Sequence, residues 1–274
     1  MKFIKFNLLA FLLVAVFSSC DQASNQNQET VTYNDTTSTT RDEMRSETKD
    51  WVSLFNGKNL EGWEVKAVKE DQHHHFWSVE EGAIVVNSLG VPDHDYSWLM
   101  TKKEYADFEL KLKFQTYRES PGNSGVQIRS RYDENGKIKG SDRLGWLDGP
   151  QIDIHPSDPW RTGLIYDETR EHQRWIYPDL PDWNIDKVTF APEEFRHYYA
   201  DETPSWNDLV IICKGNNITT IVNQIKVAEY DGTGVLDDIW HQKYGIDKSG
   251  FIALQLHKED ELKIAFKDIF IKEL

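Results

Sequence analysis

The chain has 274 residues, a length that fits one large β domain or two small domains. Its formal net charge is −15 at pH 7, and a surface this acidic repels nucleic acid and anionic membranes. We therefore expect no nucleic-acid partner, and the charge disfavours an anionic ligand unless its binding site is locally basic. Aromatic residues make up 12% of the chain, so it can build a large core.

Residues 1–20 have the pattern of a secretory signal peptide. A positively charged start precedes an apolar run from Leu8 to Phe17, which is too short to span a bilayer by itself. The run ends in Ser18-Ser19-Cys20, which resembles a bacterial lipobox, so we predict that Cys20 is lipidated. An ordinary signal peptide with a chance Cys is the alternative. The lipobox predicts secretion across the bacterial inner membrane and a lipid anchor in the cell envelope, in the periplasm or at the outer-membrane surface, as the only membrane contact.

Residues 21–50 are rich in Gln, Asn, Thr, Ser, Asp and Glu and contain almost no large apolar residues. Such a segment cannot bury enough apolar surface to fold, so it is predicted to be a disordered tether. The rest of the chain has no internal repeat and no second linker, which favours a single domain over residues 51–274. Apart from Cys20 the chain has only Cys213, so we expect a buried thiol and no disulfide.

Short runs with a period of two, separated by turn residues, predict antiparallel strands in this domain. The clearest run is residues 108–115, where apolar and polar residues alternate as in a half-exposed sheet. Similar runs occupy residues 77–79, 84–86, 126–131, 209–213, 218–222, 225–227, 251–257 and 262–271. Long helical patterns are absent, so we predict an all-β fold, a two-sheet antiparallel sandwich of jelly-roll type.

Two further segments carry the functional hypothesis. In residues 149–156, Ile152 and Ile154 alternate with polar residues, so one face of a strand would present Gln151, Asp153 and His155. Residues 160–206 are rich in Trp, Tyr, Pro and Asp and show little periodicity. A long irregular segment in a compact domain is often a lid over a site, although surface decoration is the alternative.

Eight short sequences occur in an order that resembles one family. They are residues 54–63 (LFNGKNLEGW), 107–110 (DFEL), 122–126 (GNSGV), 149–151 (GPQ), 162–166 (TGLIY), 206–207 (WN), 254–257 (LQLH) and 266–269 (FKDI). Together they resemble the 3-keto-disaccharide hydrolase family, also described as 3-keto-glucoside 1,2-lyases and 3-keto-2-hydroxy-glucal hydratases. The chain departs from many members at Pro150, where they carry an acidic residue, and at Lys258, where they carry Gly.

The resemblance implies a concanavalin-like sandwich whose concave sheet binds the ligand, and an enzyme that acts on glycosides oxidised to a ketone at C3. A C3 ketone acidifies the C2 proton, because the resulting carbanion is delocalised as an enolate. Removal of that proton expels the C1 substituent by β-elimination, and hydration of the product completes the cleavage. This route needs one base, an electrophile for the enolate oxygen and a donor for the leaving oxygen.

The polar strand faces offer candidates for these roles. Asp153 or His257 is the predicted base, and Arg129 is the predicted clamp for an enolate or hydroxyl oxygen. The alternatives are a structural ion pair between Asp153 and Arg129 and a structural hydrogen bond of His257 at a sheet edge. The residues predicted to bind substrate hydroxyls or the leaving sugar are Asn123, Gln127, Gln151, His155, Trp160, Tyr166 and Gln255.

A divalent metal ion is left open as a cofactor. The three successive histidines 73–75 face alternate ways on a strand, so they do not readily bind one ion. Asp153 with His155 or His257 is the other candidate set, and a metal there would polarise the ketone. No spacing in the sequence demands either.

Two other functions compete with the predicted one. A laminarinase-like glycosidase needs a pair of carboxylates on the central strand, and this chain has Gln151, Asp153 and His155 there. A non-catalytic carbohydrate-binding lipoprotein would use the same polar face and aromatic rings only to hold a glycan. The sequence alone does not separate binding from catalysis.

Overall fold

The computed structural model describes residues 50–120, 122–137, 142–180, 185 and 191–274. The predicted signal peptide with Cys20, and the tether as far as residue 49, lie outside the described residues. Within the described part of the chain, no helix is long and apolar enough to cross a membrane.

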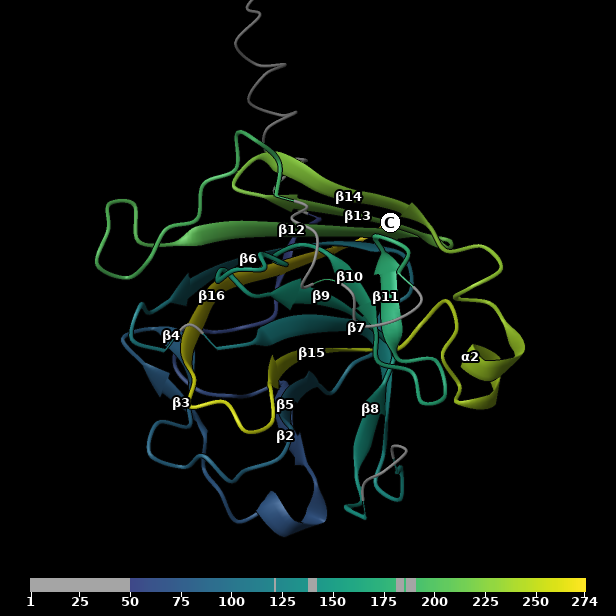
Figure 1. Cartoon of the computed structure of the whole chain (residues 1–274), viewed down its shortest axis with the longest axis horizontal. Helices are drawn as coiled ribbons and strands as arrows, with labels where there is room; N and C mark the ends of the chain where they lie inside the picture. The colour runs from purple at the N-terminus through teal and green to yellow at the C-terminus, as the bar shows by residue number, and fades with distance from the viewer. Residues whose placement is uncertain (1–49, 121, 138–141, 181–184, 186–190) are drawn as a thin grey trace, which may run out of the picture. The chain divides into compact units, whose positions relative to one another are not determined.

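Two antiparallel sheets of eight strands each form the domain (Figure 1). Sheet A has the order β14-β13-β12-β6-β16-β4-β3, with β1 paired to β16. Its strands are β1 (Val52–Ser53), β3 (Trp77–Glu80), β4 (Ala83–Asn87), β6 (Phe108–Thr116), β12 (Asn207–Lys214), β13 (Asn217–Val222), β14 (Ile225–Asp231) and β16 (Lys263–Glu273). The predicted all-β, two-sheet antiparallel sandwich is confirmed.

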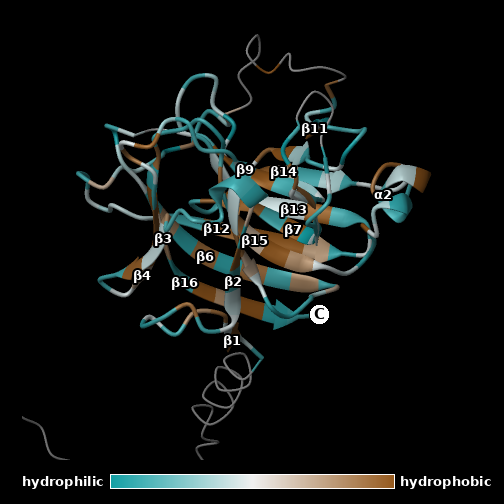
Figure 2. Ribbon diagram, turned by 90° about the horizontal axis from the view of Figure 1, so that it is seen from below, coloured by the Kyte–Doolittle hydropathy of each residue, from teal (hydrophilic) through white to brown (hydrophobic). Residues whose placement is uncertain are grey.

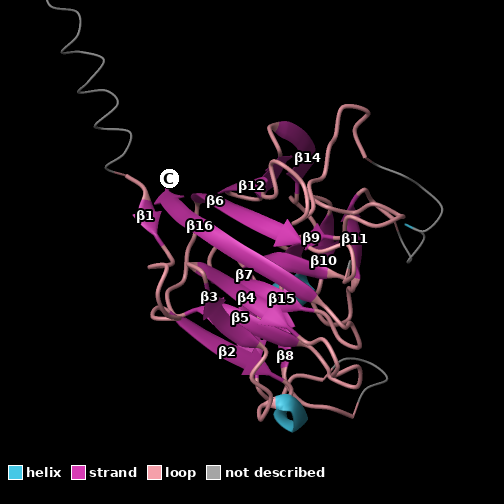
Figure 3. Ribbon diagram, turned by 90° about the vertical axis from the view of Figure 1, so that its left-hand side faces the viewer, coloured by secondary structure: helices cyan, strands magenta, loops and turns pink. Residues whose placement is uncertain are grey.

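Sheet B has the order β11-β10-β9-β7-β15-β5-β2, with β8 paired to β7. Its strands are β2 (Trp63–Ala67), β5 (Ser97–Thr101), β7 (Ser124–Asp133), β8 (Trp146–Asp148), β9 (Pro150–Ile154), β10 (Ile165–Asp167), β11 (Arg174–Tyr177) and β15 (Phe251–Leu256). Helical structure among the described residues is limited to short pieces, chiefly η1 (Lys69–Asp71) and α2 (Ile239–Lys243), as Figure 3 shows. Asp238 caps α2 by accepting hydrogen bonds from the backbone of Trp240 and His241.

Alternation along the strands places the core between the two sheets. On β6, Phe108, Leu110, Leu112 and Phe114 are buried while the residues between them are more exposed, as the sequence predicts. Figure 2 shows the same banding of apolar and polar residues along the strands of the sheets.

The buried thiol of Cys213 is also confirmed. Strands β5, β8 and β10 were not predicted, because every residue in them is buried and no alternation remains.

The central strands of sheet B use one face for the core and the other for polar side chains. Ile152 and Ile154 on β9 and Val126 on β7 belong to the core. The opposite face carries two rows of paired residues, one running through Tyr166, Gln151 and Gln127, the other through Asp153, Gly125 and Gln255. The outer face of sheet B is therefore polar at its centre, where side chains from four strands meet.

Candidate active site

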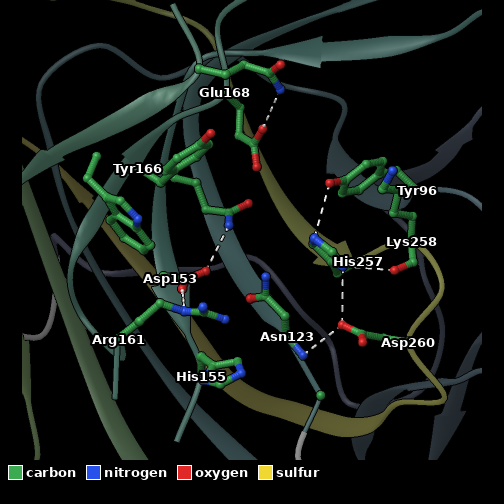
Figure 4. A pocket seen from close by; sticks show the side chains of 14 residues that line it. Tyr96, Asn123, Asp153, His155, Arg161, Tyr166, Glu168, His257, Lys258 and Asp260 are labelled. Carbon is green, nitrogen blue, oxygen red and sulfur yellow. Dashed lines mark hydrogen bonds and ion pairs between the residues drawn. The ribbon is translucent and has the colours of Figure 1, made fainter. Parts of the chain in front are cut away.

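A cavity of about 480 Å³ lies on the outer face of sheet B (Figure 4). Strand β9 contributes Gln151 and Asp153 to its wall, and β10 and the segment after it contribute Tyr166 and Glu168. His257 follows β15 and completes the wall on the other side of the cavity. The volume is within the range of small-molecule sites, about 300–1,000 Å³.

Gly125 makes room for the wall beside it. This residue pairs with Asp153 across β7 and β9, and a Cβ atom at this position would lie 2.6 Å from Cδ of Gln151. A separation this short would displace the amide of Gln151. The glycine therefore lets two polar side chains of β9 lie side by side at the cavity, which explains part of the GNSGV sequence.

Asp153 is buried, with 2% of its surface exposed. Its carboxylate accepts hydrogen bonds from Nε2 of Gln151 and from Nε of Arg161, both at 3.1 Å. The loop after β9 folds back so that the backbone of Asp153 bonds to Gly163 and Leu164, which brings Arg161 beside it. Burial raises the pKa of Asp153, although the positive charge of Arg161 opposes the change. The ion pair makes Asp153 a fixed part of the wall.

His257 is held from three directions. Its Nδ1 lies 2.9 Å from the carbonyl oxygen of Lys258 and 3.2 Å from the carboxylate of Asp260, and its Nε2 lies 3.1 Å from the hydroxyl of Tyr96. Burial disfavours the charged ring, but the hydrogen bond and charge of Asp260 and the charge of Glu168 outweigh it and raise the pKa of His257. The surroundings of this imidazole therefore favour its protonated form more than water does.

Glu168 is a buried carboxyl group with few partners. Its carboxylate receives hydrogen bonds from Nε2 of Gln173 at 3.3 Å and Nε2 of Gln255 at 3.4 Å. Burial raises its pKa from 4.5 to about 7, and the charge of His257 partly opposes this shift. A carboxyl group with a pKa near 7 can accept and return a proton at neutral pH, which is what a general base requires.

The backbone around Glu168 fixes its position. Its amide donates to the carbonyl of Gly149 at 3.0 Å, and its carbonyl accepts from Nε1 of Trp146 at 2.8 Å. The preceding residue, Asp167, points away from the cavity and pairs with the buried His241 at 3.0 Å. These contacts on both sides hold the carboxyl group in one place, as catalysis demands of a base.

Two amide oxygens in the wall are left without a partner. Oε1 of Gln151 and Oδ1 of Asn123 are buried and have no hydrogen-bond partner among the described residues. A buried acceptor without a partner costs free energy, about 1–3 kcal/mol. His155 also lines the cavity, and burial and the charge of Arg161 lower its pKa, so it is a neutral ring. The wall thus presents acceptors that suit the hydroxyl groups of a ligand.

The structure places Arg129 outside the cavity, contrary to the prediction that it clamps the substrate. Its Nε donates to the carbonyl of Ala106 at 2.9 Å and one terminal nitrogen bonds to Asp107 at 2.8 Å, while the other bonds to the carbonyl of Gly215. The cause is a break in the pairing of β7 with β15 between Phe251 and Ala253, where Arg129 adopts φ of 49°. A bulge of this kind changes the direction in which the following side chains point. The ion pair with Asp153 that we considered is not formed either.

Three predicted binding residues lie behind the cavity wall. Gln127 is fully buried and donates to the carbonyl of Leu147 at 3.0 Å. Trp160 packs on Phe195 with a ring separation of 4.5 Å and belongs to the core. Gln255 does not line the cavity, and its Nε2 donates a hydrogen bond to the carboxylate of Glu168. The prediction that Gln127, Trp160 and Gln255 contact the ligand directly is therefore corrected, because none of them lines the cavity.

The sequence reasoning placed several residues correctly and missed others. Of the predicted site residues, the structure brings together the six that line the cavity, which are Asn123, Gln151, Asp153, His155, Tyr166 and His257. It adds eight that were not predicted, namely Tyr96, Gly122, Arg161, Glu168, Gln173, Trp175, Lys258 and Asp260. Four of these lie in the aromatic segment 160–206 that the sequence marked as a lid, and that composition was the available signal.

The candidate metal ligands do not form a site. Among the residues that the structure describes, no group of three or more His, Cys, Asp or Glu side chains is arranged to hold an ion. The carboxylate of Asp153 is already paired with Arg161, and the rings of His73 and His74 lie against each other with centroids 4.0 Å apart. The residues present therefore do not fit the divalent ion that the sequence left open.

The fold and the site define a β-sandwich protein with a polar cavity of small-molecule size on the outer face of one sheet. Residues 50–272 match the family described as the 3-keto-alpha-glucoside-1,2-lyase-like domain. The chain belongs to this family, which confirms the resemblance seen in the eight short sequences. No curated protein matches the chain.

The chain is similar to several solved structures. A provisionally named glycosyl hydrolase from Parabacteroides distasonis ATCC 8503 has 21% identity and a TM-score of 0.52, with 84% of this chain and 96% of that chain covered. A second such protein from the same organism has 23% identity and a TM-score of 0.48, covering 82% and 99%. The carbohydrate-binding module CBM66 from Bacillus subtilis has 11% identity and a TM-score of 0.45, covering 79% and 98%.

Proposed function

We propose that this chain cleaves the glycosidic bond of 3-keto-disaccharides or 3-keto-glucosides by C2 proton removal, β-elimination and hydration. One observation carries the proposal. A buried carboxyl group, Glu168, with a pKa of about 7 lines the same polar cavity as His257, whose pKa is raised. A carboxyl group and an imidazole whose pKa values are both shifted, in one cavity, are typical of acid–base catalysis.

Glu168 takes the role of the base that we first assigned to Asp153 or His257. Asp153 is tied to Arg161, and His257 is biased towards its protonated form, so neither is a free acceptor near neutral pH. The ionised Glu168 removes the proton from C2, and the electron pair of the broken C–H bond moves onto the C3 oxygen as an enolate. The glutamate is thereby protonated and the substrate carries one negative charge.

The second step expels the group at C1. The enolate re-forms the C3 ketone, a double bond forms between C1 and C2, and the bond from C1 to the glycosidic oxygen breaks. His257, kept protonated by Asp260, donates its proton to that leaving oxygen. The enolate oxygen needs donors while the charge is present, and Arg161 in the cavity wall is the group that supplies them.

Hydration then restores both catalytic groups. Water adds to C1 of the unsaturated ketone, losing a proton to the neutral His257, and C2 recovers a proton from Glu168. The net reaction is hydrolysis, so no proton or electron is left unaccounted for. The amide oxygens of Gln151 and Asn123 accept hydrogen bonds from sugar hydroxyls, which satisfies two buried groups that otherwise have no partner among the described residues.

The location of the reaction is part of the proposal. The predicted signal peptide and Cys20 support a protein that is secreted and held in the cell envelope by a lipid. Metabolic labelling with a clickable fatty acid tests this directly. Incorporation into the natural chain and its loss in Cys20→Ala are expected, whereas labelling that survives Cys20→Ala contradicts the anchor.

A turnover assay tests the proposed reaction. The purified protein is given a 3-keto-disaccharide or, as a matched control, the same disaccharide with an intact C3 hydroxyl. We expect release of the leaving sugar only from the keto substrate, because only its C2 proton is acidic. Equal cleavage of both substrates would indicate an ordinary glycosidase. Binding of the keto substrate without any cleavage would favour the non-catalytic carbohydrate-binding alternative.

A further inference from the structure

A second polar depression lies on the outer face of sheet A, away from the cavity of sheet B. It consists of two adjoining hollows of about 660 Å³ and 350 Å³ that share Trp206 and Lys267. We call it the Trp206 groove and define it by Gln115, Tyr117, Trp206, Asn223, Lys263 and Lys267. Both volumes are in the range of ligand sites, about 300–1,000 Å³.

The floor of the groove is formed by small side chains. Ala83, Val85 and Ala265 lie next to one another on β4 and β16 and form a cluster against which Trp206 packs. On this outer face the neighbouring strand positions carry long side chains such as Lys263 and Lys267. A flat floor between taller walls leaves room for a ring-shaped ligand.

Aromatic rings form the walls of the groove. The ammonium group of Lys267 lies 4.1 Å from the centre of the Trp206 ring, and that of Lys263 lies 5.0 Å from the centre of the Tyr117 ring. Both rings are half-buried, and both line the larger hollow of the groove. Cation–π contacts at exposed sites are weak, so a sugar ring can replace the ammonium group over the indole.

Hydrogen bonds fix the walls before any ligand arrives. Nε2 of Gln115 donates to the carbonyl of Ser205 at 3.1 Å, and the Tyr117 hydroxyl donates to Oε1 of Gln115 at 3.1 Å. The buried Asn207 bonds to both backbone groups of Tyr198 and accepts from Nδ2 of Asn223 at 2.8 Å. The loop that carries Trp206 is thus tied to β6 and to the turn after β13, which explains the WN pair in the sequence.

The charges of the groove favour a neutral ligand. Lys263 and Lys267 face Glu80 and Glu81 across the larger hollow, so neither sign dominates. Aromatic faces, amide groups and balanced charge together suit a chain of neutral sugars, which offers apolar ring faces and many hydroxyls. We propose that the Trp206 groove is a second saccharide-binding site, which holds a neutral glycan chain independently of the reaction in the cavity.

Native affinity electrophoresis of the full-length protein tests the proposal. Gels are cast with soluble starch, laminarin, mannan or xyloglucan, and migration is compared with that in a gel without polysaccharide. We expect at least one polysaccharide to retard the natural protein and Trp206→Ala to lose that retardation. Trp240→Ala is the matched control, because Lys243 lies over Trp240 at 4.6 Å in a similar stack on α2. It should migrate like the natural protein.

Two more variants keep the outcome decisive. Lys267→Ala removes the ammonium group that covers the indole of Trp206. Because that cation–π contact is weak, its loss should strengthen polysaccharide binding about two- to five-fold. This variant tests the groove even if Trp206→Ala fails to fold. Asp153→Asn alters only the cavity and should leave retardation unchanged. Loss of retardation in Asp153→Asn but not in Trp206→Ala overturns the proposal, as does migration unaffected by all four polysaccharides. Self-association through Trp206 without retardation would instead indicate a protein contact and also overturn it.

Discussion

Two buried charged groups, Arg129 and Glu168, are held in opposite ways. The guanidinium group of Arg129 uses all of its nitrogen atoms, on two backbone carbonyls and on Asp107. The carboxyl group of Glu168 has only two long hydrogen bonds from neutral amides and no ion pair among the described residues. The first group joins the start of β6 to the turn after β12, whereas the second faces a cavity.

The number and strength of the partners of a buried charged group indicate whether the group stabilises the fold or takes part in function. A buried charge that is fully paired has a settled protonation state, and its loss is felt as instability. A buried carboxyl group with weak partners resists ionisation, which raises its pKa towards the working pH. Burial of Glu168 with weak partners lowers the stability of the folded protein when this carboxyl group is ionised. We therefore expect that the group is placed there for catalysis.

The largest expected effect is on turnover. Glu168→Gln keeps the shape of the side chain but removes the base, so kcat on a 3-keto-glucoside should fall by about 10²–10⁴-fold. Gln173→Leu is a milder companion that removes one hydrogen bond to the carboxylate and should slow the reaction much less. Turnover of Glu168→Gln at the natural rate would remove Glu168 from the mechanism.

Replacement of Arg129 should lower the stability of the protein and leave its turnover unchanged. Arg129→Met removes a buried cation, leaves two carbonyls without this donor and leaves Asp107 with the Gly215 amide but no cation, which should lower the free energy of unfolding by about 3 kcal/mol. The kcat per folded molecule should not change, because the guanidinium does not reach the cavity. Denaturant titration and an assay below the unfolding transition measure the two effects. A loss of kcat without a loss of stability would make Arg129 functional after all.

The stability of Glu168→Gln relative to the natural protein should depend on pH, because only the natural protein titrates at this position. The folded-state pKa of Glu168 is raised to about 7 from 4.5, so the folded state binds its proton more tightly than the unfolded state. The stabilisation from this proton is complete below pH 4.5 and is lost as the pH rises to about 7. At pH 8 the glutamine variant should therefore be more stable than the natural protein by about 3 kcal/mol, from about 1.36 kcal/mol for each pKa unit. Equal stability across this range would contradict the raised pKa.

The smallest predicted effect is on the pH profile of turnover. Activity needs an ionised Glu168 and a protonated His257, so it should rise through about pH 7 and fall again at the raised pKa of His257. Asp260→Asn removes the carboxylate that raises that pKa, so the alkaline limb should move to lower pH. A limb that stays in place would mean that another group donates the proton.

The sequence predicted the parts of the fold that follow a simple period. Strand β6 alternates along its length, and the faces of β9 that carry Gln151 and Asp153 follow from the same period. The period-two pattern gave the wrong direction for the side chain of Arg129, because this residue lies at a bulge and has a positive φ. The bulge does not change the pattern of apolar residues, so the sequence does not reveal it. A single irregular residue was enough to misplace a predicted catalytic group.

Glu168 was missed for a different reason. It follows β10, a strand of three fully buried residues in which neither period is visible. Its importance comes from burial and from its neighbours His257 and Gln255, which are about ninety residues away in sequence. Such properties depend on tertiary packing, so a carboxyl residue in a poorly patterned segment gives no local sign of them.

The identity of the proton that Glu168 removes is tested most directly by running the reaction in deuterated water. The 3-keto-glucoside is cleaved to partial completion, and the C2 position of the sugar product is examined by NMR beside an enzyme-free control. We predict deuterium at C2 from the first turnovers, because the protonated Glu168 exchanges its proton with the solvent before it protonates that carbon. A product that keeps its original hydrogen at C2 would show that the bond at C1 is broken without proton removal.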